Sequence, residues 1–188
     1  MPDRTALLEL IRARGYLHTE TPLQLASGEL SQDFIDGKKA LARGADLRAA
    51  CEHIVARAHE AGVRFDAVGG LTMGADHLSH GVALVADVEW FTVRKEPKGR
   101  GTGKLIEGSE LGPGRQVLVV EDVVTSGGSA LRACDAVEAT GARVAAVATL
   151  VDRGDVARGA FTARGYAYLP MLTYVDFGIP RVGPAAAG

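Results

Sequence analysis

Apolar residues recur at two different spacings along the chain, and the alternation between them predicts the architecture. Helical spacing is clear over residues 5–14 and 45–61, and Gly62 follows the second segment as a helix stop. Shorter helices are predicted over 75–84 and 128–140. Segments expected to form strands, the last of which closes the sheet, lie at 65–71, 88–95, 114–122, 142–152 and 161–179. Strands that alternate with helices build βαβ units, so the sequence predicts an α/β fold with a mostly parallel sheet flanked by helices.

The two ends of the chain differ from this regular middle. Residues 19–38 are irregular, with turn-forming residues between short strands. Together with the first helix they are expected to form a small N-terminal hood over about residues 1–40. The last residues, about 180–188, have the composition of a flexible tail. The 188 residues as a whole are expected to form a single domain.

Composition and charge exclude several classes of protein. Hydrophobic residues are 47% of the chain and charged residues 23%, which is typical of a globular protein. A net charge of −2 gives no overall attraction to nucleic acid or to an anionic membrane. The apolar stretches are too short to span a bilayer, and the charged start is unlike a signal peptide. Cys51 and Cys134 have neither disulfide-framework nor metal-ligand spacing. We therefore expect a cytoplasmic protein without nucleic-acid or membrane partners.

The segment 117–130, VLVVEDVVTSGGSA, carries the strongest chemical signal. Its apolar start predicts a strand buried on both faces, and Glu121 and Asp122 follow at the carboxyl end. The glycine and hydroxyl residues from Thr125 to Ser129 let successive N–H groups cradle a phosphate at the start of a helix. Two acids would repel that phosphate, but they suit a ribose whose hydroxyls also coordinate Mg²⁺. A strand with an acidic turn and a serine-rich helix cap is the alternative, but the ordered combination favours a sugar-phosphate site.

Two further loops follow predicted strands. Residues 69–74 end a strand and open a helix, so their N–H groups can bind an anion, although a structural glycine turn gives the same pattern. Residues 94–104, RKEPKGRGTGK, hold five cationic residues and no apolar anchor before Leu105. A solvated surface loop is the alternative for this basic segment. The carboxyl ends of parallel strands meet at one edge of a sheet, so we expect both loops to lie beside the loop at 121–129.

These residues together resemble the type I phosphoribosyltransferases, which use 5-phosphoribosyl 1-diphosphate (PRPP). In that family the acid pair holds the ribose hydroxyls and the glycine loop holds the 5-phosphate. The resemblance implies these roles for a continuous run of residues: Glu121, Asp122, Val123, Val124, Thr125, Ser126, Gly127, Gly128 and Ser129. It also implies a pyrophosphate loop at Thr72, Met73 and Gly74. Displacing pyrophosphate builds charge on both fragments, which explains the need for Mg²⁺, cationic side chains and a lid that excludes water.

Within the family, the basic loop is similar to that of the orotate enzymes. There the loop crosses a dimer interface and completes the neighbouring subunit's site, so the resemblance implies a homodimer. It implies that pyrophosphate or PRPP is bound by Arg94, Lys95, Lys98 and Arg100. Lys98, Arg94 and Arg100 are expected to act in catalysis together with Asp122. Mg²⁺ is expected to be held by PRPP itself, with Asp122 as the one candidate for a protein contact.

The predicted acceptor site rests on two further similarities. LASGELSQDFIDGKKAL, residues 25–41, is similar to the S-G-x-x-S-x-x-Y-x-D-x-R hood of the orotate enzymes, with Phe34 for Tyr and Lys38 for Arg. Arg153 matches the Arg of a D-R pair that binds the orotate carboxylate, and Arg is also the physically expected partner of a planar acid. In the family, backbone groups of the hood hold the pyrimidine. The orotate-binding residues so implied are Phe34, Ile35, Thr125 and Arg153.

The function predicted is transfer of the 5-phosphoribosyl group from PRPP to orotate, which gives orotidine 5-phosphate and pyrophosphate for UMP synthesis. Some departures from the family keep another acceptor base open: Ala26 replaces a Lys that contacts substrate, and Arg100 replaces a His. A PRPP-binding regulator without turnover is a third hypothesis. Such a regulator usually needs a nucleic-acid surface, and the sequence has no basic patch for one. The complete basic loop favours an enzyme.

Overall fold

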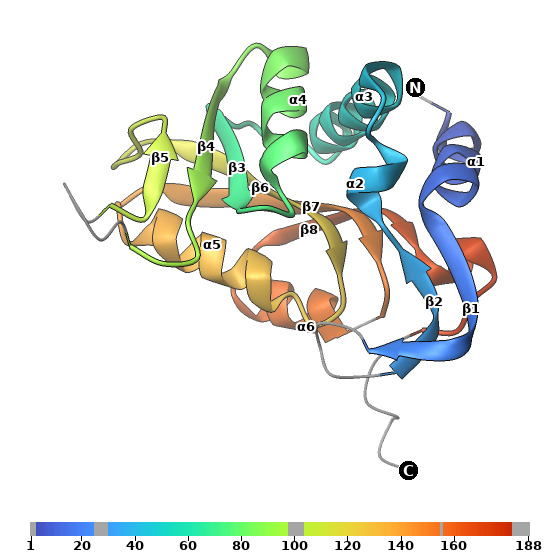
Figure 1. Cartoon of the computed structure of the whole chain (residues 1–188). Helices are drawn as coiled ribbons and strands as arrows, with labels where there is room; N and C mark the ends of the chain where they lie inside the picture. The colour runs from blue at the N-terminus through green and yellow to red at the C-terminus, as the bar shows by residue number, and fades with distance from the viewer. Residues whose placement is uncertain (1–2, 25–29, 98–103, 155, 182–188) are drawn as a thin grey trace.

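A six-stranded sheet forms the centre of the molecule, with the strand order β5-β4-β3-β6-β7-β8 (Figure 1). The computed structural model describes residues 3–24, 30–97, 104–154 and 156–181. Neighbouring strands are parallel, except that β5 runs antiparallel to β4. The strands are β3 (Ala67–Leu71), β4 (Glu89–Val93), β5 (Ile106–Gly108), β6 (Gln116–Val124), β7 (Arg143–Asp152) and β8 (Ala167–Thr173). The predicted α/β fold with a mostly parallel sheet is therefore confirmed.

Helices cover both faces of this sheet (Figure 1). On one face lie α1 (Arg4–Gly15), α3 (Gly44–Glu60) and α4 (Asp76–Ala86), whose apolar residues join one core cluster with Leu118 and Val120 of β6. On the other face lie α5 (Gly128–Glu138) and α6 (Val156–Ala163), packed on Val117 and Val119. Burial on both faces explains the continuous apolar runs of β6 and β7. None of the helices in the described ranges has the length and apolar character that a membrane span requires.

The segment expected to form the hood contains an antiparallel pair, β1 (Tyr16–Gln24) and β2 (Leu30–Ile35), followed by the short helix α2 (Gly37–Ala40). It is more regular than the short strands and turns expected for residues 19–38. Asp33 links the two strands, because its Oδ1 accepts a hydrogen bond from the Tyr16 hydroxyl at 2.7 Å and lies 2.9 Å from His18 Nδ1. Burial alone would raise the pKa of Asp33, but the hydrogen bonds from His18 and Tyr16 hold it below its usual value. Ala26 lies outside the described residues.

The expected closing segment, 161–179, holds only one strand. Its first residues belong to α6 and its last to a short 3-10 helix, η1 (Tyr174–Phe177). Ala157 and Phe161 lie one turn apart and are both fully buried, so α6 packs through this pair on the sheet. Within this segment, only residues 167–173 form a strand, and most of their side chains are buried. Most of the expected tail, from residue 182, lies outside the described residues.

The strands β6 and β5 also differ from the prediction. β6 runs to Val124, beyond the expected end at Asp122, because Val123 and Val124 pair with Val151 and Asp152 of β7. β5 was not predicted at all: it is three residues long and gains its extended form by pairing with β4. Both differences arise from pairing with a neighbouring strand, which a local sequence pattern does not contain.

Candidate active site

The loops that follow β3 and β6, and the described start of the loop that follows β4, lie at one edge of the sheet, as the sequence predicts. The three strands are parallel neighbours, so their carboxyl ends share that edge. The Thr72 N–H donates to the Val93 carbonyl at 2.9 Å, which joins the first loop to the strand that leads into the basic loop. A Cβ at Gly74 would collide with the Glu121 carboxyl group, so the missing side chain lets the pyrophosphate loop lie against the acid pair.

A cleft of about 410 Å³ opens at this edge beside β6. Its lining comes from the end of β6, the glycine loop, the first turns of α5 and the residue after β7. The lining residues are Glu121, Val123, Val124, Thr125, Ser126, Gly127, Gly128, Ser129, Arg132 and Arg153. The structure therefore brings nearly the whole predicted PRPP segment together with Arg153, whose predicted role concerns the acceptor base.

Gly127 turns the chain from β6 into α5. Its φ is 81°, in the left-handed region that favours glycine, and a Cβ there would lie 2.7 Å from the buried Phe161 ring. α5 begins at Gly128 with no side-chain cap, so the N–H groups of its first turn point towards the cleft without a competing acceptor from the cap residue. This is the geometry that a helix N-terminus offers to a phosphate.

Arg132 is a lining residue that the sequence reasoning missed. It lies four positions after Gly128, and residues at this spacing share one face of a helix. A cation one turn into a helix that follows a phosphate-binding glycine loop is the signal that could have indicated it. The exposed Arg132 guanidinium adds positive charge to the end of the cleft where the helix begins.

Glu121 and Asp122 are buried within the last part of β6, with 5% and 8% of their surface exposed. Asp122 accepts hydrogen bonds from the Val123 N–H at 2.7 Å and from Lys38 Nζ at 2.9 Å. Glu121 Oε2 has no partner among the described residues. Burial first, and then the neighbouring Asp122 charge, raise the pKa of Glu121 to about 8. Glu121 thus has one unsatisfied buried carboxyl oxygen, to which a sugar hydroxyl could donate.

Lys38, noted in the sequence only as a replacement for Arg, connects the hood to the acid pair. It lies on α2, and its ammonium group reaches the Asp122 Oδ2 across the gap between the hood and the sheet. Burial alone would lower the pKa of Lys38, but the hydrogen bond and charge of Asp122 outweigh it and raise the pKa. The ammonium group therefore remains charged and balances one of the two adjacent acids.

Arg153 brings the predicted acceptor residues together. It is 7% exposed, and its guanidinium carbon lies 5.3 Å from the centre of the Phe34 ring. Its Nη2 donates to the Ile35 carbonyl at 3.5 Å, whereas its Nε has no partner among the described residues. Thr125 lines the same cleft as Arg153. The orotate-binding roles of these four residues stay predictions, but the structure places them at one end of the site.

Only the two ends of the basic loop belong to the described residues. The Arg94 Nη1 lies 3.8 Å from Glu107 Oε1, and the Arg94 Nε donates to the Glu96 carbonyl at 3.4 Å. Lys95 is exposed, and neither cation is among the residues that line the 410 Å³ cleft. Lys98 and Arg100 lie outside the described residues. The catalytic roles of these cations therefore stay predictions.

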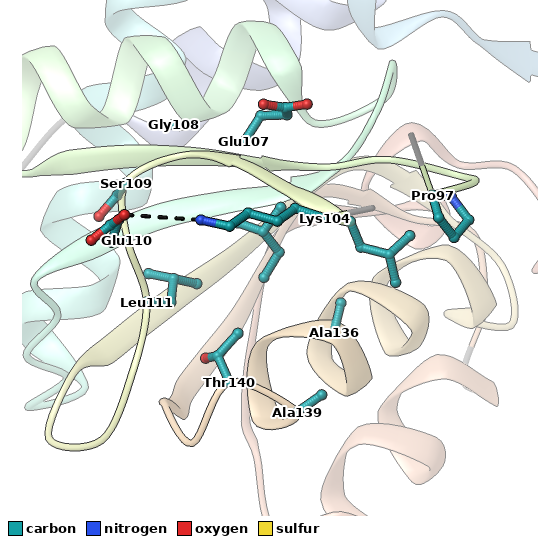
Figure 2. Close-up of a pocket in the computed structure, with 12 residues that line it drawn as sticks. Pro97, Lys104, Glu107, Gly108, Ser109, Glu110, Leu111, Ala136, Ala139 and Thr140 are labelled. Atoms are coloured by element: carbon teal, nitrogen blue, oxygen red, sulfur yellow. Dashed lines mark ion pairs between the residues drawn. The ribbon is translucent and has the colours of Figure 1, made fainter. Parts of the chain in front are cut away.

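A larger cavity of about 650 Å³ lies at the base of the basic loop, between the β5 region and the second half of α5 (Figure 2). Lys104 extends along it and pairs with Glu110 at 3.9 Å (Figure 2). Ala136 and Ala139 form part of its wall on α5. Among the described residues that line it, none is predicted to bind PRPP or orotate. Its walls combine aliphatic residues with two glutamates, so the smaller cleft, with its glycine loop and arginines, is the better match for a sugar phosphate.

Comparison with known proteins agrees with this assignment. The phosphoribosyl transferase domain matches residues 38–158, which include the pyrophosphate loop, the acid pair and the glycine loop. The chain belongs to the phosphoribosyl transferase family. The resemblance seen in the motifs is thus confirmed, and the protein is an enzyme of the glycosyltransferase type.

Several relatives of this phosphoribosyltransferase are orotate phosphoribosyltransferases. That of Thermococcus gammatolerans is 40% identical over 148 residues, which are 79% of this chain and 78% of the relative. That of Mycobacterium tuberculosis is 38% identical over 180 residues, which are 95% and 98% of the two chains. The solved structure of the Mycobacterium tuberculosis enzyme in complex with PRPP has a TM-score of 0.77 at 35% identity, and the match covers 95% of this chain and all of that one.

The family match runs from residue 38 to residue 158, so it leaves out Phe34 and Ile35 before it and Tyr174 after it. The matched part includes the glycine loop and Arg153 of the cleft. The hood and η1, which flank Arg153, lie beyond it.

Proposed function

We propose that this phosphoribosyltransferase transfers the 5-phosphoribosyl group of PRPP to orotate. The observation that carries the proposal is the position of Arg153, a buried cation on the wall of the ribose-phosphate cleft whose Nε has no partner in the described part of the chain. A guanidinium group binds a planar carboxylate through two parallel hydrogen bonds, and orotate is a pyrimidine that bears such a carboxylate. The orotate phosphoribosyltransferases among the relatives support the same acceptor.

In this reaction the deprotonated ring nitrogen of orotate attacks C1 of the ribose with inversion. The bond from C1 to the pyrophosphate oxygen breaks, and its electron pair leaves with pyrophosphate, so orotidine 5-phosphate and pyrophosphate are formed. The ring nitrogen loses its proton to solvent before the attack, so the nucleophile is already anionic and the protein does not need a strong general base. The contribution of the protein is to orient the two substrates. The glycine loop and Arg132 hold the 5-phosphate, and Glu121 accepts a hydrogen bond from a ribose hydroxyl.

Mg²⁺ fits the donors of this site. Carboxylate and hydroxyl oxygens are the ligands it prefers, and Glu121 and Asp122 lie where the ribose hydroxyls are proposed to bind. Within the described ranges, no group of three or more acidic, His or Cys side chains could hold a metal by itself. We therefore propose that PRPP carries the metal and that Asp122 is the side chain that would contact it. When bound, the ion would neutralise charge on the departing pyrophosphate.

We also propose a homodimer in which the basic loop acts in the partner's site. Two neighbouring elements, α4 and β4, carry exposed apolar side chains: Leu84 is 85% exposed, and Trp90, 42% exposed, packs edge-on against His80 at 4.5 Å. Met73 of the pyrophosphate loop, 69% exposed, precedes α4. Exposed apolar groups on adjoining elements are typical of a protein interface. A partner on this surface would lie beside the pyrophosphate loop.

Mixing two impaired variants, assayed at an orotate concentration far below the raised KM of Arg153→Ala, tests the shared loop. Lys98→Ala is expected to cripple turnover while leaving PRPP binding largely intact, and Arg153→Ala removes the acceptor contact. If the loop acts across the interface, a dimer formed from one of each has one complete site, and an equal mixture should recover roughly a quarter of wild-type activity. Absence of recovery, with mixed dimers shown by mass spectrometry, would place the loop in its own subunit's site.

Turnover assays with a panel of bases test the acceptor. The protein is incubated with PRPP, Mg²⁺ and each base, and loss of orotate absorbance and release of pyrophosphate are followed. Arg153→Ala should raise KM for orotate about 10- to 100-fold, the loss of a charged hydrogen bond, with a smaller effect on KM for PRPP. Arg158→Ala is the control, because Arg158 lies over the Tyr168 ring and does not line the cleft.

The same assays separate the two alternatives. Turnover of another base but not of orotate would contradict the proposed acceptor. Tight PRPP binding without turnover of any base would instead favour a regulator.

A further inference from the structure

Arg153 lies close to two aromatic rings that come from distant parts of the chain. Its guanidinium carbon is 5.3 Å from the centre of the Phe34 ring and 6.0 Å from that of the Tyr174 ring. Phe34 belongs to β2 of the hood, whereas Tyr174 is the first residue of η1. Aromatic faces attract a guanidinium group and restrict its rotation. The edge of the guanidinium, where its N–H groups lie, is left for hydrogen bonding.

Tyr174 is itself held firmly. It is fully buried, and its hydroxyl donates to the Asp33 carbonyl at 3.3 Å. Burial raises the pKa of Tyr174, so the hydroxyl keeps the proton that it donates. η1 is fixed by a reciprocal cap, in which Thr173 and Asp176 bind each other's backbone and side-chain groups. Tyr174 is therefore a rigid link between Arg153 and the hood strand that carries Phe34.

The hydrogen bonds of Arg153 are incomplete in this arrangement. The Nη2 bond to the Ile35 carbonyl is long, at 3.5 Å, and the buried Nε has no partner among the described residues. A buried guanidinium with unsatisfied donors gains most from a ligand that accepts two parallel bonds. Because Arg153 lines the same cleft as the glycine loop, that ligand would lie beside the bound ribose.

We propose that Tyr174 is a positioning residue that sets selectivity for a carboxylate-bearing pyrimidine by holding Arg153 in place. This inference rests on the proposed function. Tyr174 is not among the residues that line the cleft, so it acts through Arg153 and not by touching the acceptor. Without its ring, the Arg153 side chain would gain rotational freedom, which binding of the carboxylate would then have to remove. Acceptors without a carboxylate would not be affected.

The test compares orotate with uracil, which lacks the carboxylate. For Tyr174→Leu we expect KM for orotate to rise roughly three- to tenfold, the cost of ordering one long side chain. The inhibition constant of uracil, measured in competition with orotate, and KM for PRPP should each change less than twofold. Tyr174→Phe keeps the ring and should retain most of the wild-type preference for orotate. Tyr174→Met fills a similar volume without an aromatic face and should reproduce the leucine result, so it serves if the leucine variant does not fold.

Tyr168→Leu is the matched control. Tyr168 is also buried, its ring lies under another arginine, Arg158, at 5.3 Å, and neither residue lines the cleft. It should lower stability without changing the ratio of orotate to uracil binding. Equal effects of the Tyr174 variants on orotate, uracil and PRPP would show a merely structural role and overturn the inference. If the wild-type enzyme turned over no orotate, the proposed function itself would fail, which is a separate outcome.

Discussion

Replacing Gly127 by alanine tests how the buried core shapes the phosphate-binding loop. An L-residue at a φ of 81° costs about 1–2 kcal/mol. The new Cβ would also lie 2.7 Å from Phe161, whose fully buried ring packs on Tyr168 at 4.9 Å and has little room to move, so overpacking adds about 1–3 kcal/mol. The lower entropy of the unfolded alanine chain offsets about 0.4–1 kcal/mol. We therefore expect the free energy of unfolding to fall by about 2–4 kcal/mol.

Gly165→Ala provides a matched control. Gly165 has a similar φ of 77°, but a Cβ there would meet no atom within 4 Å. Its replacement should therefore cost only the backbone term, about 1 kcal/mol. Unfolding by urea, followed through the fluorescence of the single tryptophan, Trp90, gives both values. Steady-state kinetics should show KM for PRPP raised about tenfold or more in Gly127→Ala, because the N–H groups of the loop are displaced, and unchanged in Gly165→Ala.

Equal losses of stability in the two variants would refute the role given to Phe161. An unchanged KM for PRPP in a folded Gly127→Ala variant would refute the assignment of this loop to the 5-phosphate. A crystal structure of the variant with inorganic phosphate would then show whether the loop had moved.

Two further predictions concern charged residues that link the outer segments to the sheet. Lys38→Met removes the cation that balances Asp122 and should raise KM for PRPP about tenfold, as the loss of one charged hydrogen bond does. The control, Lys39→Met at the exposed neighbouring position, should leave KM for PRPP unchanged. Equal effects of the two variants in steady-state assays would argue against the Lys38–Asp122 link. Burial alone would raise the pKa of Asp176, but the hydrogen bond from Arg4 at 2.7 Å and the cap of η1 hold it below its usual value. The contribution of ionised Asp176 to the free energy of unfolding is therefore fully present above the unfolded-state pKa and is lost as the pH falls through the lower folded-state pKa. Asp176→Asn should lower the free energy of unfolding by about 1 kcal/mol at neutral pH, and this difference between variant and wild type should shrink towards zero below about pH 4. Urea titrations at several pH values measure it. A difference that stays constant with pH would contradict an ionic origin of the Asp176 contribution.

The sequence by itself determined the ribose-phosphate end of the site. The apolar strand, the acid pair and the glycine loop follow one another directly between residues 117 and 130. Their geometry arises locally, from a strand end, a left-handed glycine and a helix N-terminus, so contiguous residues are enough to predict it. The shared edge of the three loops also followed from the sequence, because parallel strands with helical crossovers all end on the same side.

Only the tertiary structure decided how the acceptor end is built. Arg153 could be singled out in the sequence, but the ring of Tyr174 against it could not, and the Tyr174 hydroxyl meets the Asp33 carbonyl across 141 positions of the chain. Lys38 likewise meets Asp122 across 84 positions. Such contacts depend on how the hood, η1 and the sheet pack together, and no local periodicity or motif encodes that packing. The proposed phosphate site is a property of one segment, whereas the proposed base site is a property of the whole fold.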